Sequence, residues 1–180
     1  NEIRAKDGRW KIIFHTDATQ AVNYFNCNVE RLGVDLLSFS GHKIYGPKGV
    51  GALYVRKNTP LKAIQDGGDQ EYKLRAGTHN VPAIVCLGKS EELVRKNQKK
   101  ETQKIIVLRD YLIEKVLKEI TKVNVNGSQI HRSPNNANFS FQGVEGEGLL
   151  LALDMEGVAC STGSACSSGS LSQSHVLLAL

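Results

Sequence analysis

The chain is organised around the stretch Ser38-Phe39-Ser40-Gly41-His42-Lys43-Ile44-Tyr45-Gly46-Pro47-Lys48-Gly49. An apolar run, Leu36-Leu37-Ser38-Phe39, leads into it and gives way abruptly to small and polar residues. This pattern predicts a buried strand that runs out into a turn, and open α/β sheets bind their ligands at such strand ends. The strand end carries a hydroxyl, an imidazole and an amine. Lys43 is therefore a candidate site residue, although most lysines are solvated and a surface lysine on a loop is the simpler alternative.

The glycine-rich turn resembles a phosphate-binding P-loop only in part. Gly41 and Gly46 have the spacing of the two P-loop glycines, but Pro47 stands where that motif requires lysine. We therefore do not expect a nucleoside triphosphatase. Ser40, His42 and the nearby backbone amides could still form a nest for an anion.

A second strand end lies upstream of this turn. Apolar residues predict a strand over Arg9–His15 that is buried on both faces, with Asp17 at the point where the strand gives out. A short helix could follow from Ala18. Gln20 lies about one helical turn after Asp17, so both side chains could face the same ligand.

The rest of the sequence alternates strand and helix patterns, which predicts an α/β fold. Apolar residues between Pro82 and Ile120 recur at spacings of three and four, as in one or two long amphipathic helices. A change in the pattern of elements places a domain boundary on this helix near Arg95, which gives domains 1–95 and 96–180. The other predicted elements are strands over 50–55, 123–125, 138–141 and 158–160 and helices over 145–155 and 171–180.

Composition excludes several classes of protein. Hydrophobic residues make up 41% of the 180, enough for a packed core, yet no apolar run approaches the ~20 residues that cross a membrane. The net charge of +5 is densest over Arg95–Lys104, which has no aromatic residue. We interpret this run as a solvated helix face, with an anion site as the lesser alternative. No set of Cys and His has the spacing of a zinc finger, so we expect no metal site. From the apolar runs and the charge pattern we also expect no membrane and no nucleic acid as partners.

Four cysteines form no C-x-x-C pair, which favours reduced thiols in a cytosolic setting. Cys160 follows apolar residues and is interpreted as a core cysteine, as are Cys27 and Cys86. Cys166 lies in a run of small and polar residues over 161–170. Taken alone, that run fits a passive linker cysteine and a reactive thiol equally well.

The candidate residues of the two strand ends suggest one cofactor. Pyridoxal phosphate needs a lysine for its Schiff base, a carboxylate for its pyridinium nitrogen and donors for its phosphate. The residues that meet these needs are Asp17, Gln20, Ser40, His42 and Lys43.

Four motifs, in order and at compatible spacings, resemble the NifS/IscS type of cysteine desulfurase, which belongs to the class V aminotransferases of pyridoxal-phosphate fold type I. The motifs are His15–Ala21, Ser38–Gly49, Arg75–Thr78 and Ser164–Ser168, and the likeness runs through almost the whole chain. The resemblance implies the C-terminal part of a large mixed-sheet domain followed by most of a smaller α/β domain.

The resemblance also implies a role for each matching residue at the cofactor ring. Lys43 would carry the Schiff base and later move protons at the substrate α-carbon. Asp17 would keep the pyridine nitrogen protonated, and Gln20 would hydrogen-bond the phenolic oxygen of the ring.

Other matching residues would hold the phosphate or accept sulfur. Ser40 and His42 would bind the phosphate, and Thr78 would reach the phosphate in the neighbouring subunit of a homodimer. Cys166 would be the nucleophile that takes sulfur from L-cysteine as a persulfide, with release of L-alanine. A loop without large apolar residues suits a thiol that must reach inward and then outward.

The resemblance implies partners as well: a sulfur-acceptor or scaffold protein for iron–sulfur cluster assembly or thiolation, in the cytoplasm or an organelle matrix. Complete members have further segments on both sides that supply cofactor and substrate ligands. We therefore expect the chain to be an internal segment that is inactive by itself. A selenocysteine lyase, another class V aminotransferase-like enzyme and a fragment that only binds a partner are the alternatives.

Overall fold

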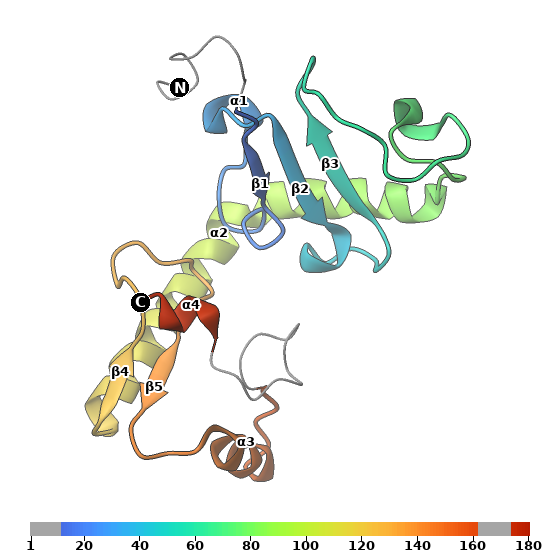
Figure 1. The fold of residues 1–180 in the computed structure, drawn as a ribbon. Helices are drawn as coiled ribbons and strands as arrows, with labels where there is room; N and C mark the ends of the chain where they lie inside the picture. The colour runs from blue at the N-terminus through green and yellow to red at the C-terminus, as the bar shows by residue number, and fades with distance from the viewer. Residues whose placement is uncertain (1–11, 162–173) are drawn as a thin grey trace. The chain divides into compact units, whose positions relative to one another are not determined.

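The computed structural model describes residues 12–161 and 174–180 (Figure 1). The chain divides into two compact units, Asn1–Thr102 and Gln103–Leu180. Helix α2, Val81–Glu119, contains the division. The sequence placed a domain boundary on the same helix, near Arg95.

The first unit contains a mixed sheet with strand order β1-β2-β3 (Figure 1). Strand β1, His15–Asp17, runs parallel to β2, Leu36–Ser40, and β3, Gly51–Val55, runs antiparallel to β2. The short helix α1, Val29–Leu32, lies between β1 and β2 in the sequence. The α/β class predicted from the sequence is thus confirmed.

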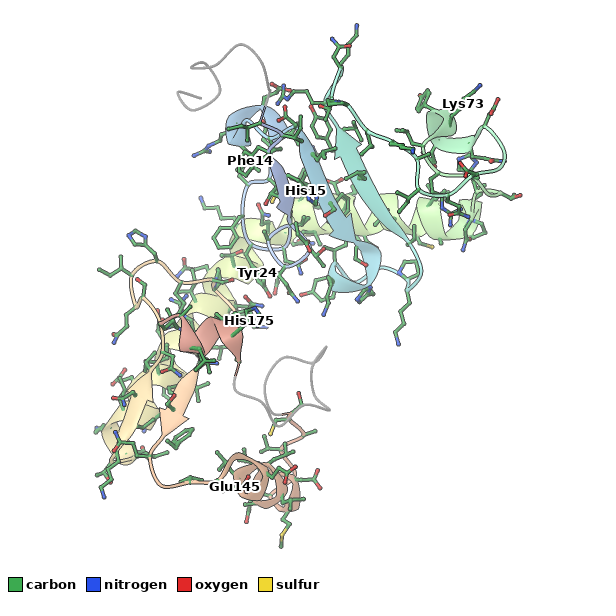
Figure 2. The ribbon with its side chains drawn as sticks, viewed as in Figure 1. Phe14, His15, Tyr24, Lys73, Glu145 and His175 are labelled. Carbon is green, nitrogen blue, oxygen red and sulfur yellow. The ribbon has the colours of Figure 1, made fainter. Side chains whose placement is uncertain are left out.

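Strand β1 is shorter and more exposed than the sequence predicted. Within the described residues it begins only at His15, which follows Phe14 (Figure 2). The side chains of Ile12 and Phe14 are 55% and 48% exposed. Residues 9–11 lie outside the described part. The prediction of a strand buried on both faces is wrong for residues 12–15, because in the described chain β1 is an edge strand that pairs with β2 alone.

The segment after β1 folds into turns instead of the short helix that the sequence allowed. The backbone N–H groups of Ala21 and Val22 both donate to the carbonyl of Ala18. Asp17 accepts a hydrogen bond from the N–H of Thr19, 2.9 Å away, an Asx-type contact that competes with a regular helix start. We refer to residues 18–25 as the β1 turn.

Alternation along β2 separates a packed face from an open one. Leu37 and Phe39 point to the side covered by α2 and the β1 turn, whereas Ser38 and Ser40 point to the opposite side. Two small clusters form the core on the covered side. They consist of Ala18, Val34 and Leu37, and of Ile44, Leu87 and Val94, and Phe39 packs against both.

The turn after β2 packs tightly against α2. The 3₁₀ helix η2, Gly41–Lys43, is followed by Ile44, which is fully buried. A Cβ atom on Gly46 would lie 2.9 Å from the Ser90 hydroxyl of α2, so only glycine fits this close approach without a shift. A second 3₁₀ helix, η3, Gln70–Lys73, lies in the loop between β3 and α2.

The described residues of the second unit include the C-terminal part of α2, the strands β4 and β5 and the helices α3 and α4. Strands β4, Val123–Val125, and β5, Phe139–Phe141, are antiparallel, and they match the predicted strands to within one residue. Helices α3, Gly146–Met155, and α4, His175–Leu178, follow.

One predicted strand is wrong. Residues 158–160 form no strand, and Val158 is half exposed. Three apolar-leaning residues are too short a signal to define a strand, and among the described residues no strand pairs with them.

None of the helices in the described residues is long and apolar enough to span a membrane. No group of three or more metal-ligating side chains occurs in the same residues.

Candidate functional site

Lys43 ends η2, and its side chain is exposed. Its backbone is held from two directions. Ile44, the next residue, is buried in the cluster with α2. The Asn23 side-chain amide of the β1 turn donates to the Lys43 carbonyl over 2.6 Å. The amine therefore projects from a fixed backbone and remains accessible to a ligand.

Asp17 is the last residue of β1, and its carboxylate is exposed. The side-chain hydroxyl of Thr19, and then its backbone N–H, hydrogen-bond the carboxylate and lower the pKa of Asp17 below its usual value. Asp17 is consequently an anion at neutral pH. An anion at this position is suited to hold a protonated ring nitrogen.

The parallel register brings the two strand ends together. Asp17 is the register partner of Ser38, and the N–H of Ala18 donates to the Ser38 carbonyl over 2.8 Å. The His15 imidazole lies 3.1 Å from the Ser38 hydroxyl on the same face of the sheet (Figure 2). Because β1 and β2 are parallel, their carboxyl ends lie side by side. Asp17 therefore lies next to the strand that leads directly to Lys43.

Ser40 and His42 form a pair at the start of η2. The Ser40 Oγ and the His42 Nδ1 are 2.8 Å apart. Gly41 between them is buried, and a Cβ there would lie 3.0 Å from the Pro47 carbonyl oxygen. The turn therefore holds a hydroxyl and an imidazole side by side, an arrangement that could donate hydrogen bonds to an anion.

The other predicted site residues belong to three separate parts of the chain. Gln20 is exposed in the β1 turn, within the segment that follows Asp17. Thr78 is exposed in the loop between η3 and α2, which lies beyond β3, at the opposite edge of the sheet from β1 (Figure 1). Within one chain, Thr78 and Asp17 therefore lie toward opposite sides of the sheet. Cys166 lies outside the described residues.

The three cysteines of the described part are free. Cys27 is half-buried against the first core cluster, and burial raises the pKa of its thiol. Cys86 and Cys160 are exposed, so the prediction that both are core residues is wrong. Cys86 is exposed although the next residue of α2, Leu87, is buried, and the segment of Cys160 forms no strand.

Two amide side chains near Lys43 were not identified from the sequence. Asn23 contacts the Lys43 carbonyl, and Gln98 of α2 donates to the carbonyls of Val22 and Phe25 over 2.8 and 3.1 Å. These contacts join residues up to 76 positions apart. Neither residue belongs to a motif or a periodic pattern, so no local signal could have identified them.

A family model described as aminotransferase class-V matches residues 1–178 of the chain. Similar curated relatives include the cysteine desulfurase IscS of Dictyoglomus turgidum, 56% identical over 171 residues that make up 95% of this chain and 43% of the relative. IscS of Methanosarcina thermophila is 50% identical over 94% of this chain and 42% of the relative. The chain therefore spans less than half the length of these relatives.

Solved structures show the same fold. A NifS-like protein from Rickettsia africae superposes with a TM-score of 0.79 at 33% identity, over 84% of this chain and 42% of the other. SspA, solved in complex with cysteine, superposes with a TM-score of 0.67 at 35% identity, over 93% of this chain and 46% of the other. The described α/β structure is thus part of the fold of these NifS-like proteins, as the sequence predicted.

Proposed function

Because the chain belongs to the aminotransferase class-V family, we propose that it supplies the lysine and the sulfur-accepting cysteine of a pyridoxal-phosphate-dependent cysteine desulfurase. The substrate is L-cysteine, and the products are an enzyme persulfide and L-alanine. The observation that carries the proposal is that Asp17, at the carboxyl end of β1, lies beside the strand leading to Lys43. The 56% identity to an IscS protein over nearly the whole chain supports it.

The described residues fit the cofactor. Pyridoxal phosphate carries an aldehyde, a basic ring nitrogen and a phosphate. The exposed Lys43 amine suits the aldehyde, the ionised Asp17 carboxylate suits the ring nitrogen, and the Ser40–His42 pair suits the phosphate. These groups differ in chemistry and lie at the neighbouring carboxyl ends of β1 and β2, as the binding of a single small molecule requires.

When bound, pyridoxal phosphate supplies the electron sink that lets an amino acid lose its α-proton. Asp17 keeps the ring nitrogen charged by remaining an anion. Lys43 would hold the cofactor through its amine, and the same amine would move the proton at the α-carbon of the substrate.

Cys166 carries the transferred sulfur. Its thiolate attacks the sulfur of the bound substrate, a sulfur–sulfur bond forms and the carbon–sulfur bond breaks. The electron pair of the broken bond passes to the substrate carbon, which gains a proton and becomes the methyl group of alanine. The sulfur stays on Cys166 as a persulfide, ready for a thiol of an acceptor protein.

Further proposals concern the setting of the reaction. The acceptor is a protein of iron–sulfur cluster assembly or thiolation, and the enzyme works as a homodimer in which Thr78 serves the neighbouring subunit. The exposed position of Thr78, away from Asp17, supports that assignment. The free thiols of the described residues support a reducing compartment, the cytoplasm or an organelle matrix.

The test uses the full-length polypeptide that contains this chain, incubated with L-cysteine. We expect alanine to form and intact-peptide mass spectrometry to show one added sulfur on Cys166. Cys166→Ala should abolish both, whereas Cys86→Ala, which removes another exposed thiol, should change neither. Sulfide release by Cys166→Ala at the parent rate would refute the mechanism. Alanine formed from L-selenocysteine, supplied in a parallel reaction, but not from L-cysteine would favour a selenocysteine lyase.

A further inference from the structure

We propose that Asn23 is a positioning residue for Lys43 and that Gln98 holds the segment that carries Asn23. The inference rests on the proposed role of Lys43 as the cofactor-binding amine. It adds two side chains that act through the lysine backbone and do not touch the substrate.

The contact between Asn23 and Lys43 has a defined direction. The Asn23 Nδ2 donates to the Lys43 carbonyl over 2.6 Å, which is short for a hydrogen bond of this kind. The Asn23 Oδ1 is buried and has no hydrogen-bond partner within the described residues. Rotating the amide would bring two oxygens together, so this orientation is the only one in which the side chain can bind the carbonyl.

Gln98 fixes the same turn from the other side. Its Nε2 donates to the carbonyls of Val22 and Phe25, which flank Asn23 in the sequence. Gln98 lies one helical turn after Val94, which packs against Ile44, the residue that follows Lys43. A closed circuit of contacts therefore runs from α2 through the β1 turn to Lys43 and back through Ile44 to α2.

This circuit matters because a lysine side chain is long and flexible. Only the backbone of Lys43 can be held rigidly, and its amine must meet an aldehyde at a fixed distance from Asp17. Two contacts fix the distance between Asp17 and the Lys43 backbone. The register of β1 on β2 places Asp17 beside Ser38, and the Asn23 hydrogen bond ties the turn after Asp17 to Lys43. Preorganisation of this kind raises the rate at which two groups react.

The experiment measures how fast Lys43 forms its bond to the cofactor. In the full-length polypeptide stripped of cofactor, added pyridoxal phosphate condenses with the Lys43 amine and releases one water, and a visible absorption band rises. We expect Asn23→Ala and Gln98→Ala to slow the rise about three- to tenfold and to move the pH midpoint of the band. Asn23→Asp should be slower still, because a carboxylate would face the Lys43 carbonyl.

Asn97→Ala is the matched control. Asn97 is an exposed neighbour of Gln98, and in the part of the chain that the structure describes its amide donates to the Leu93 carbonyl of α2. Its variant should react like the parent. A parental rate and pH midpoint in Asn23→Ala and Gln98→Ala would overturn the positioning role, and so would an equal loss in Asn97→Ala. If thermal unfolding shows that Asn23→Ala does not fold, Gln98→Ala decides the question alone.

A further variant separates this inference from the proposed function. Lys43→Ala must abolish the band. A band that survives in Lys43→Ala, or none in the parent, refutes the proposed function and the positioning role together. A band that depends on Lys43 but is indifferent to Asn23 and Gln98 refutes only the positioning role.

Discussion

At the scale of the residue, Asp17 shows how a local contact prepares a group for its task. The carboxylate is exposed and, like an ordinary aspartate, is charged throughout the neutral range. The hydrogen bonds from Thr19 lower its pKa further, so the charge persists to more acidic pH. An exposed anion costs little to maintain and is available to a cationic partner.

Asp17→Asn should retain the fold and weaken cofactor binding. An asparagine oxygen can still accept from the Thr19 N–H, but the variant loses the negative charge that we propose pairs with the ring nitrogen. We expect the dissociation constant of pyridoxal phosphate to rise about tenfold or more, as for loss of a charge-assisted hydrogen bond. Absorbance titration from pH 5 to pH 8 checks this. In the parent, titration of Asp17 within that range would contradict the lowered pKa.

Gly51 is required by backbone packing. It is the register partner of Ser40, and a Cβ there would lie 2.6 Å from the Phe39 carbonyl oxygen. Gly51→Ala should therefore lower the free energy of unfolding by about 1–3 kcal/mol. Chemical denaturation measures this, with Gly88→Ala in α2 as control. A Cβ on Gly88 meets open space, so that variant should be neutral or slightly stabilised. Equal effects of the two variants would show that the close approach at Gly51 is unimportant.

The sequence indicated Lys43 and Asp17 because each follows an apolar strand, a pattern readable from neighbours in the chain. Asn23 and Gln98 act through contacts formed only after the sheet and helix have packed. Exposed Cys86 and Cys160 were misassigned for a related reason. Apolar neighbours in sequence do not reveal which way a side chain points.

At the scale of the element, α2 was predicted best, because its apolar residues repeat over many turns and the signal accumulates with length. Strand β1 was predicted too long and too buried. Burial of a strand depends on which strands flank it, and its own residues do not specify this. The absent strand at 158–160 rested on very few residues, too few to distinguish a strand from an extended loop.

Glu145 caps α3 and should make that helix sensitive to pH. Its carboxylate accepts hydrogen bonds from the N–H of Gly148 and then of Glu147, and these lower its pKa (Figure 2). Because the pKa is lowered on folding, the cap stabilises α3 above the usual glutamate pKa and is lost as the pH falls through the lowered value.

NMR titration of the Glu145 carboxyl carbon and of the Glu147 and Gly148 amides tests this cap. The three signals should move together, with a midpoint below the usual glutamate value of about 4.3. Glu145→Gln should remove the transition. A midpoint at or above the usual value would contradict the capping geometry.

At the scale of the whole molecule, the chain spans 43% of a relative to which it is 56% identical. It holds Lys43 and Asp17 at the carboxyl ends of two neighbouring strands, and both residues are exposed. A cofactor needs contacts on both ring faces to bind tightly. The partial fold was predictable from the order of the four motifs.

The 180 residues produced alone should therefore bind pyridoxal phosphate poorly and show no visible band at concentrations that saturate the full-length polypeptide. Absorbance spectra of the two proteins, side by side, give the answer. A band from the 180 residues that disappears in Lys43→Ala would show that this chain suffices for binding.

The central claim is that Lys43 is the amine that binds the cofactor. Its most direct test is borohydride reduction of the full-length polypeptide with pyridoxal phosphate, followed by peptide mass mapping. We expect one pyridoxyl label, on Lys43, and no label in Lys43→Ala. A label on another lysine such as Lys48, or the same labelling in Lys43→Ala, would contradict the claim.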